Sequence, residues 1–154
     1  MSCIPIGSPA LLNPHGKAIA GKPAIPLNLT QPKMYDETPA QLVAHLTDPN
    51  GWWRDNAQRI LVLKQDKSVV PTLKTMAQSS SNQLARIHAL WTLEGLGSAD
   101  PALLRELMKS PDAQIRQQAI RASETLYKGG DRSFAADWKA LAKDTDTDVA
   151  TSAG

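Results

Sequence analysis

The chain repeats one short pattern, Arg-x-x-Ala, at nearly even spacing. The pattern occupies residues 54–57, 86–89 and 116–119, and Ala150 holds the place of the arginine near the C-terminus. Successive copies are 30 to 34 residues apart. This period is typical of helical solenoids, in which each repeat is a helical hairpin that buries its apolar side only against its neighbours. We therefore expect an all-α, right-handed α-solenoid.

A small polar residue precedes each copy of the pattern by six positions. These residues align without a gap, and they are Asp48, Ser80, Ser110 and Asp144. A polar side chain at the entrance of a helix accepts hydrogen bonds from free backbone N–H groups and so caps the helix. We expect each of these residues to cap the second helix of its unit.

The composition of the chain changes near residue 36. Residues 1–35 hold six of the eleven prolines and three of the nine glycines. Because proline interrupts helices and sheet ladders, the sequence predicts an extended Pro/Gly-rich arm or linker over residues 1–35. The repeat domain then covers residues 36–154, in units at about 38–66, 67–98, 99–130 and 131–154, which is about three and a half hairpins.

The first unit shows the expected signals of a helical hairpin. Thr38 and Pro39 predict the start of a first helix, and Leu42, Val43 and Leu46 form its apolar stripe. The second helix is expected from about residue 52 to residue 63.

Two adjacent tryptophans open that second helix. Adjacent residues on a helix point about 100 degrees apart, so the two side chains cannot both face the core squarely. The spacing to the apolar positions of the helix makes Trp53 the buried one. Trp52 is then the exposed candidate for contacting a neighbouring domain, although packing against its own loop explains it equally well.

The fourth unit has room for only a short second helix. The chain therefore reads as part of a longer array, whose last unit leaves one side of the third unit uncovered. We expect an apolar patch there, formed partly by Leu126, Trp138 and Leu141, and we expect this patch to favour self-association.

The positive net charge of the chain is concentrated outside the repeats. The formal net charge is +2 and the isoelectric point is about 8.8. Residues 1–35 hold three of the 17 basic residues and no acidic residue, so the repeats carry 14 basic against 15 acidic side chains. Nucleic-acid binding requires positive charge concentrated on the binding face, so this balance argues against it.

Several other classes of protein find no support in the sequence. No run of 18 apolar residues predicts a membrane span, and the N-terminus lacks the features of a signal peptide, so the compartment is not predicted. The single cysteine, Cys3, forms neither an intramolecular disulfide nor a zinc site.

Motifs of metal binding and catalysis are also missing. His15, His45 and His88 do not have the spacing of a metal motif, and neither a phosphate loop nor a nucleophile elbow is present. We therefore predict no catalytic residue, no metal and no cofactor.

One group of polar and aromatic residues is the best candidate for binding a protein partner. His88, Trp91 and Glu94 are spaced by three and share a helical face, next to Arg86. With Trp52 and Arg54 they are the candidate partner-binding residues. The structural alternative, which we favour, is that His88 and Glu94 satisfy polar groups between units while Trp91 fills the core.

The aligned acidic and arginine positions resemble those of HEAT repeat proteins. In that family the Asp and Arg residues of successive units form a hydrogen-bonded ladder along the inner helices. The resemblance implies that Asp48, Arg54, Arg86 and Arg116 are structural ladder residues here. Ser80 and Ser110 stand where the family has an acid, so the ladder is expected to be weaker and held partly by neutral acceptors.

Two stretches, residues 50–59 and 88–96, carry a narrower resemblance. They are similar to the helical segment of large exported bacterial proteins that lies between a β-propeller, of the quinone or sorbosone dehydrogenase type, and a c-type haem domain. The chain lacks the Cys-x-x-Cys-His motif of haem attachment and the short strands of a propeller. The resemblance therefore implies a connector without either redox centre.

The sequence thus predicts a non-catalytic scaffold that contacts a protein partner or neighbouring domains. The alternative function is a nucleic-acid-binding module like the HEAT-like DNA glycosylases, which use a basic aromatic face. In that alternative the binding residues are Trp52, Trp53, Arg54, Arg86 and Trp91. The near-neutral charge of the repeats favours the scaffold.

Overall fold

The computed structural model describes residues 31–154, with side chains from Met34 onward. The repeats belong to one compact unit, Met34–Gly154. The predictions for Cys3, for His15 and for an extended arm over residues 1–30 lie outside the described residues.

The described residues form helices and loops, and no strand occurs among residues 31–154. The all-α prediction is therefore confirmed for this part of the chain. The helices are α1 (Gln31–Asp36), α2 (Pro39–His45), α3 (Gly51–Lys64), α4 (Val70–Ser79), α5 (Gln83–Gly95), α6 (Pro101–Met108), α7 (Ala113–Lys128), α8 (Ala135–Leu141) and α9 (Thr147–Ala153). The short 3-10 helices Lys67–Val69 and Arg132–Phe134 lead into α4 and α8.

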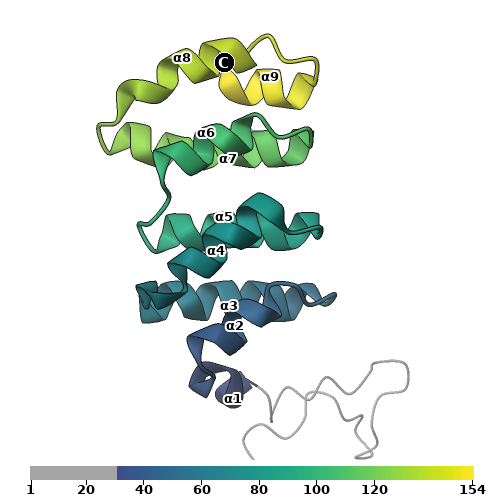
Figure 1. Cartoon of the computed structure of the whole chain (residues 1–154), viewed down its shortest axis with the longest axis vertical. Coiled ribbons are helices and arrows are strands. Elements are labelled where there is room, and N and C mark those ends of the chain that lie inside the picture. Colours follow the sequence, from purple (N-terminus) through teal and green to yellow (C-terminus); the bar gives the residue numbers. More distant parts are fainter. Residues whose placement is uncertain (1–30) are drawn as a thin grey trace, which may run out of the picture. The chain divides into compact units, whose positions relative to one another are not determined.

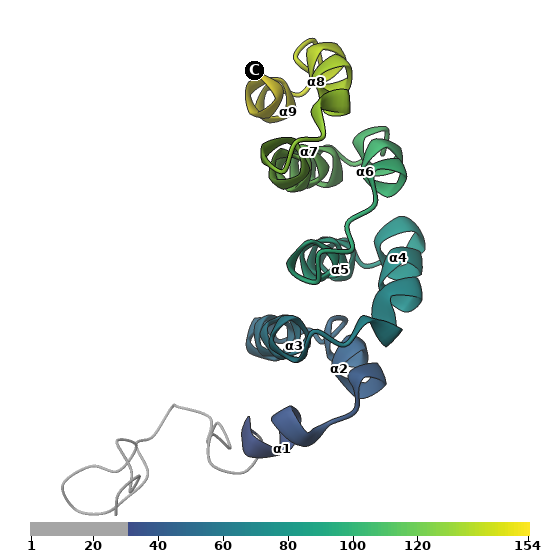
Figure 2. The same cartoon turned by 90° about the vertical axis from the view of Figure 1, so that its left-hand side faces the viewer.

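Helices α2 to α9 stack as four hairpins in two layers. The first layer holds α2, α4, α6 and α8, and the second layer holds α3, α5, α7 and α9 (Figures 1 and 2). Each first-layer helix contacts the second-layer helix that follows it, and α3, α5, α7 and α9 contact one another in sequence. Each ladder arginine is the fourth residue of a second-layer helix, and Ala150 is the fourth residue of α9.

The region expected to be extended contains a short helix at its end. Residues 31–35 belong to α1, so the prediction of an extended conformation up to residue 35 is wrong for these residues. Met34 is buried, with 1% of its surface exposed. The Lys64 ammonium lies 5.0 Å from the centre of the Tyr35 ring, and Glu37 accepts a 2.8 Å hydrogen bond from His45. Contacts with α2 and α3, which local sequence does not reveal, thus fix this segment.

The apolar stripes of successive hairpins form one continuous core. The predicted stripe of α2, formed by Leu42, Val43 and Leu46, is buried as expected. A close approach between α3 and α5 depends on Gly95, because a Cβ at this position would lie 2.5 Å from a methyl group of Val62. Burial of apolar stripes between units is the main stabilising term of such a stack.

The predicted N-caps of the second-layer helices are wrong by two residues. The side chains that cap the first-turn N–H groups are Asn50, Asn82, Asp112 and Asp146. The aligned residues Asp48, Ser80, Ser110 and Asp144 instead accept hydrogen bonds of 2.8, 3.2, 3.2 and 2.9 Å from the backbone N–H groups of those caps. They therefore fix the turn before each helix. Asx and Ser turns use the same oxygen atoms as caps, so the sequence alone did not separate the two roles.

The apolar patch expected in the fourth hairpin is not exposed. Leu126, Trp138 and Leu141 are partly buried against the core, and the Trp138 indole N–H donates a 2.9 Å hydrogen bond to the Ser123 hydroxyl. Phe134 and Val149 are fully buried and close this end of the core. The short helix α9 packs against α7, so the three side chains do not form the open apolar patch that was expected, and self-association of the chain stays a prediction.

None of the helices in residues 31–154 has the length and apolar character needed to cross a lipid bilayer.

Candidate functional site

The tryptophan pair at the start of α3 packs within its own hairpin. The Trp53 ring stacks on His45 with ring centres 5.1 Å apart, and Trp52 meets Trp53 edge-on at 5.1 Å. Both tryptophans are half-buried. The expected difference between a buried Trp53 and an exposed Trp52 is therefore not found, because His45 of α2 stacks on Trp53 and Trp53 packs against Trp52.

The candidate partner-binding residues of α5 point to two different neighbouring helices. The His88 Nδ1 atom lies 2.7 Å from the Gln58 side-chain oxygen on α3. The Trp91 indole N–H donates a 3.0 Å hydrogen bond to the side-chain oxygen of Gln118 on α7. The structure thus places His88 and Trp91 between units, and it does not gather them into one pocket.

The other two candidates of this group make main-chain contacts. The Arg86 Nε–H donates a 2.9 Å hydrogen bond to the Ala77 carbonyl, and the Glu94 carbonyl accepts a 2.9 Å bond from the N–H of Gly97. Both side chains are partly buried. Glu94 therefore belongs to the helix end, and Arg86 belongs to the contact between α5 and α4.

His88 has the most distinctive electrostatic environment of the described histidines. Burial between α3 and α5 lowers the pKa of His88, the Asp55 carboxylate at 3.8 Å opposes this effect, and the nearby Arg54 charge adds to it. The neutral imidazole is therefore favoured, which suits its hydrogen bond with Gln58. This arrangement supports stacking, because the hydrogen bond between His88 and Gln58 joins α5 to α3.

At the C-terminal end of the ladder, the arginine forms an ion pair with an acidic residue of the next hairpin. The Arg116 Nε and Nη2 atoms donate to the two carboxylate oxygens of Asp144, at 3.0 and 2.9 Å. The Arg116 Nη1 atom donates to the carbonyls of Ser110 and Pro111, at 2.9 and 3.2 Å. The Asp144 carboxylate accepts hydrogen bonds from the Asp146 N–H and from Arg116. Both hydrogen bonds lower the pKa of Asp144, the first more strongly than the second. The bidentate ion pair between Arg116 and Asp144 therefore joins α7 to the loop of the next hairpin.

The other ladder arginines have only neutral acceptors among the described residues. The Arg54 Nη1 atom donates to the Asp48 carbonyl at 2.5 Å, and the Asp48 carboxylate contacts the Asn50 N–H instead. Asp48 is therefore no acidic ladder partner, contrary to the expectation. The Arg54 Nε atom is buried without a hydrogen-bond partner in this part of the chain. Ser80 and Ser110 occupy the places that correspond to Asp144.

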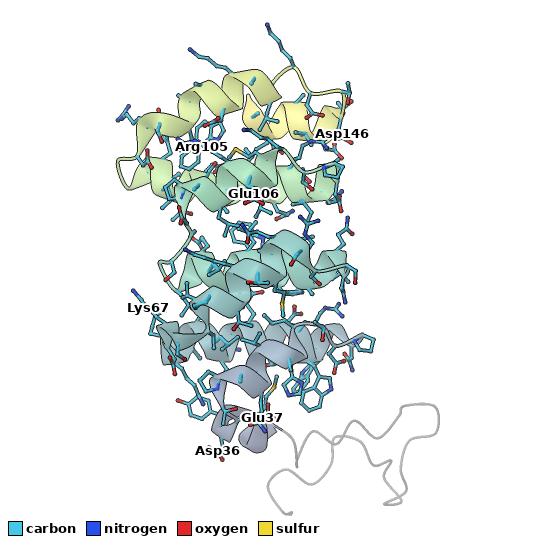
Figure 3. The ribbon with its side chains drawn as sticks, viewed as in Figure 1. Asp36, Glu37, Lys67, Arg105, Glu106 and Asp146 are labelled. Atoms are coloured by element: carbon cyan, nitrogen blue, oxygen red, sulfur yellow. The ribbon has the colours of Figure 1, made fainter. Side chains whose placement is uncertain are left out.

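The first layer contains a second set of inter-unit polar contacts, which the sequence analysis missed. Arg105 on α6, which is labelled in Figure 3, donates to Asp137 on α8 at 3.0 Å and to Ser133 at 2.6 Å. Lys74 lies 3.3 Å from Asp100, and Gln78 lies 2.7 Å from Glu106. The partners are 26 to 32 residues apart, so the repeat period was the only signal that could have found them.

A hollow of about 350 Å³ lies between α2 and the start of α4. Thr38, Val43 and Asp66 are among its lining residues. The Asp66 carboxylate accepts hydrogen bonds from Ser68, which lower the pKa of Asp66. In residues 31–154 no group of three or more His, Cys, Asp or Glu side chains is arranged to hold a metal ion.

The repeat geometry agrees with the family to which the sequence is similar. A family model described as HEAT repeats matches residues 39–124, which is more than half of the chain. No curated protein and no solved structure matches the sequence. The matched residues run from the start of α2 into α7, and they include the hairpins that carry Arg54, Arg86 and Arg116. The chain therefore belongs to the HEAT repeat family.

Proposed function

We propose that this chain is a non-catalytic scaffold that holds a protein partner or neighbouring domains at a fixed separation. In this proposal the four hairpins, the last of which has a short second helix, form a right-handed solenoid. The observation that carries the proposal is the engagement of its polar side chains between units. His88 binds Gln58, Trp91 binds Gln118, and Arg116 binds Asp144.

These contacts support a stiff stack. Each partner lies about one repeat away along the chain, and such contacts occur in both layers. Bending or sliding one hairpin against the next separates these donors from their acceptors, which is unfavourable where the groups are partly buried. A stack held in this way keeps the distance between its ends.

The exposed apolar side chains suggest where a partner binds. Leu63 on α3 and Leu84 on α5 are 65% and 45% exposed, and both belong to second-layer helices. Exposed apolar side chains contribute to partner binding when they become buried in an interface. The second layer is therefore the proposed partner-facing surface.

The more specific proposal is that the chain is a connector in a larger exported protein. The two stretches that resemble such connectors, residues 50–59 and 88–96, include parts of α3 and α5. In this case the neighbouring domains are a propeller dehydrogenase and a c-type haem acceptor, and the stack sets the distance between their redox centres. The isolated chain then has no redox activity of its own.

A distance measurement tests the stiffness of the stack. Gln41 on α2 and Lys139 on α8 are exposed, so both accept a spin label after replacement by cysteine in a Cys3→Ser background. We expect one narrow distance distribution by pulsed electron paramagnetic resonance. A broad distribution from a folded, helical protein would contradict the scaffold proposal.

A capture experiment tests the partner-facing surface. The bait is the intact chain, and the variant Leu63→Glu/Leu84→Glu places two charges on the second layer. We expect the bait to retain specific proteins that the variant loses. The matched control, Ala102→Glu/Ala136→Glu, changes two exposed first-layer positions and should retain them. Retention of the same proteins by all three baits would contradict the assignment, and retention of duplex DNA alone would favour the nucleic-acid alternative.

A further inference from the structure

Four loops lie along one edge of the repeat unit (Figure 1). They join each first-layer helix to its second-layer helix, at residues 46–50, 80–82, 109–112 and 142–146. We call this the loop edge, and Figure 3 labels Asp146 on it. Arg54, Arg86 and Arg116 project from the first turns of α3, α5 and α7, beside these loops.

The three arginines differ in how many of their N–H groups are used. Arg116 donates through all three guanidinium nitrogens and faces a carboxylate. Arg54 donates through Nη1 only, and Arg86 donates through Nε only, to carbonyl groups within the described residues. A guanidinium has five N–H donors and keeps its charge at all ordinary pH values. Arg54 and Arg86 therefore retain donors that suit a carboxylate.

Two serines explain why these arginines lack an acid. Ser80 and Ser110 occupy the position in their hairpins that Asp144 occupies in the last one. Their hydroxyl oxygens accept hydrogen bonds of 3.2 Å from the N–H groups of Asn82 and Asp112. Asp144 makes the same turn contact with one oxygen and still reaches Arg116 with both. A serine reproduces the turn but supplies no negative charge.

The missing carboxylates do not come from the remaining part of the chain. Residues 1–30 contain no Asp and no Glu. No described acidic side chain lies within ion-pair distance of Arg54 or Arg86. Both arginines are partly exposed on the surface of the repeat unit. Charge complementarity points to an acidic segment of a protein partner.

We propose that Arg54 and Arg86 form a docking site for an acidic peptide segment, with one carboxylate bound to each guanidinium. This inference rests on the proposed scaffold function and names the chemistry of its partner. Packed helices are about 8–10 Å apart, and an extended polyproline II chain brings residues i and i+3 to the same side about 9 Å apart. The matching motif is therefore two acidic residues separated by two others, in an extended and proline-containing context. Bidentate Arg–carboxylate pairs provide the affinity.

A peptide titration of the intact chain tests this site. The probe is a fluorescein-labelled peptide, Gly-Glu-Pro-Pro-Glu-Gly, and the matched control replaces both glutamates by glutamine. We expect saturable binding of the glutamate peptide by fluorescence anisotropy at low salt, and at least about tenfold weaker binding of the control, because the two lost charge-assisted pairs together contribute at least about 1.4 kcal/mol. Arg54→Gln/Arg86→Gln should weaken binding by a similar factor.

Two further variants separate binding from folding. Arg116→Gln removes an arginine that is already paired, so it should lower the thermal stability while leaving the peptide affinity within about twofold. Ser80→Asp/Ser110→Asp supplies the missing carboxylates from inside the chain. This variant should be more stable than the original protein and should lose peptide binding, a combination that misfolding does not produce.

Three results would overturn the acidic-peptide site. They are no saturable binding at millimolar peptide, equal binding after Arg54→Gln/Arg86→Gln, and displacement by inorganic phosphate or duplex DNA as effective as that by free glutamate peptide. The capture experiment keeps the two proposals distinguishable. If Arg54→Gln/Arg86→Gln still retains the captured proteins, the acidic site fails while the scaffold stands. If the intact chain retains none although the peptide binds, the scaffold fails while the site stands.

Discussion

The two ends of the arginine ladder show what one side chain changes in a repeated structure. Arg54 and Arg116 occupy the same turn of equivalent helices, and both donate to a carbonyl of their own loop. Arg116 also meets Asp144 of the next hairpin, whereas Arg54 has Ser80 at that place. Helix packing and loop carbonyls therefore position the arginine in both cases. The presence of the acidic residue determines only whether the charge of the arginine is neutralised within the stack.

Removal of the paired arginine is expected to have the largest effect. Arg116→Gln eliminates a bidentate ion pair between two hairpins, so we expect the melting temperature Tm to fall by about 8 °C. Arg54→Gln removes one carbonyl hydrogen bond and a buried N–H without a partner, so its Tm should change by less than about 4 °C. Thermal unfolding followed by circular dichroism measures both. Equal losses in the two variants would contradict the comparison.

The Tm difference between the original protein and Arg116→Gln should depend on pH in the acidic range. The pKa of Asp144 is lowered in the folded protein, so its carboxylate stabilises the fold fully above the unfolded value of 3.8. This contribution is lost as the pH falls through the lower, folded pKa. The Tm difference between the original protein and Arg116→Gln should therefore shrink as the pH falls from 7 towards 2.

The matching comparison for Arg54→Gln provides the control, since no acid faces this arginine among the described residues. Its small Tm difference should be nearly the same at both pH values. An undiminished difference for Arg116→Gln at pH 2 would show that hydrogen bonds to the loop carbonyls, and not the ion pair, account for the stabilisation.

Replacement of Ser80, which occupies the position of the ladder acid, by aspartate should give a smaller change that stabilises the fold. Ser80→Asp keeps an oxygen for the Asn82 N–H and places a carboxylate at the position that corresponds to Asp144, which pairs with the arginine of the preceding hairpin. We expect a gain of about 1 kcal/mol in the free energy of unfolding, measured by urea denaturation. Ser80→Asn is the matched control, because it has the same shape without the charge. A gain of the same size in the control would assign the effect to the turn.

The smallest expected effect concerns His88, which lies between the two ends of the ladder. Burial lowers its pKa below 6.5, so the unfolded chain binds its proton more readily than the folded one. The free energy of unfolding should therefore decrease as the pH falls through 6.5, and His88→Gln should remove this dependence. An imidazole titration by nuclear magnetic resonance that gives a pKa above 6.5 would contradict the prediction.

The sequence predicted the features that depend on the repeat period. The register of Arg54, Arg86 and Arg116 and the stripe of α2 follow from positions along a helix, because side chains three or four residues apart share a face. The helical residues 31–35 were missed because a proline-rich composition concealed contacts with the first hairpin. The caps were placed two residues early because Asx turns and caps use the same residue types.

The candidate site shows the limit of local spacing. His88 and Trp91 share a helical face, as predicted, yet one binds α3 and the other binds α7. Leu126, Trp138 and Leu141 also have apolar spacing, and only the packing of α8 and α9 showed that they are half-buried. Local periodicity gives the direction of a side chain, whereas its partner depends on how far apart the helices pack.

The sequence by itself determined the helical class, the repeat register and the near-neutral charge of the stack, because these depend on residue type and on spacing along one helix. Only the tertiary structure decided which polar groups meet. Within residues 31–154, Arg116 pairs with an acid and Arg54 does not, and the difference arises from a residue 26 to 28 positions further along the chain. Hydrogen bonds act over about 3 Å, so their partners are defined only when the hairpins stack.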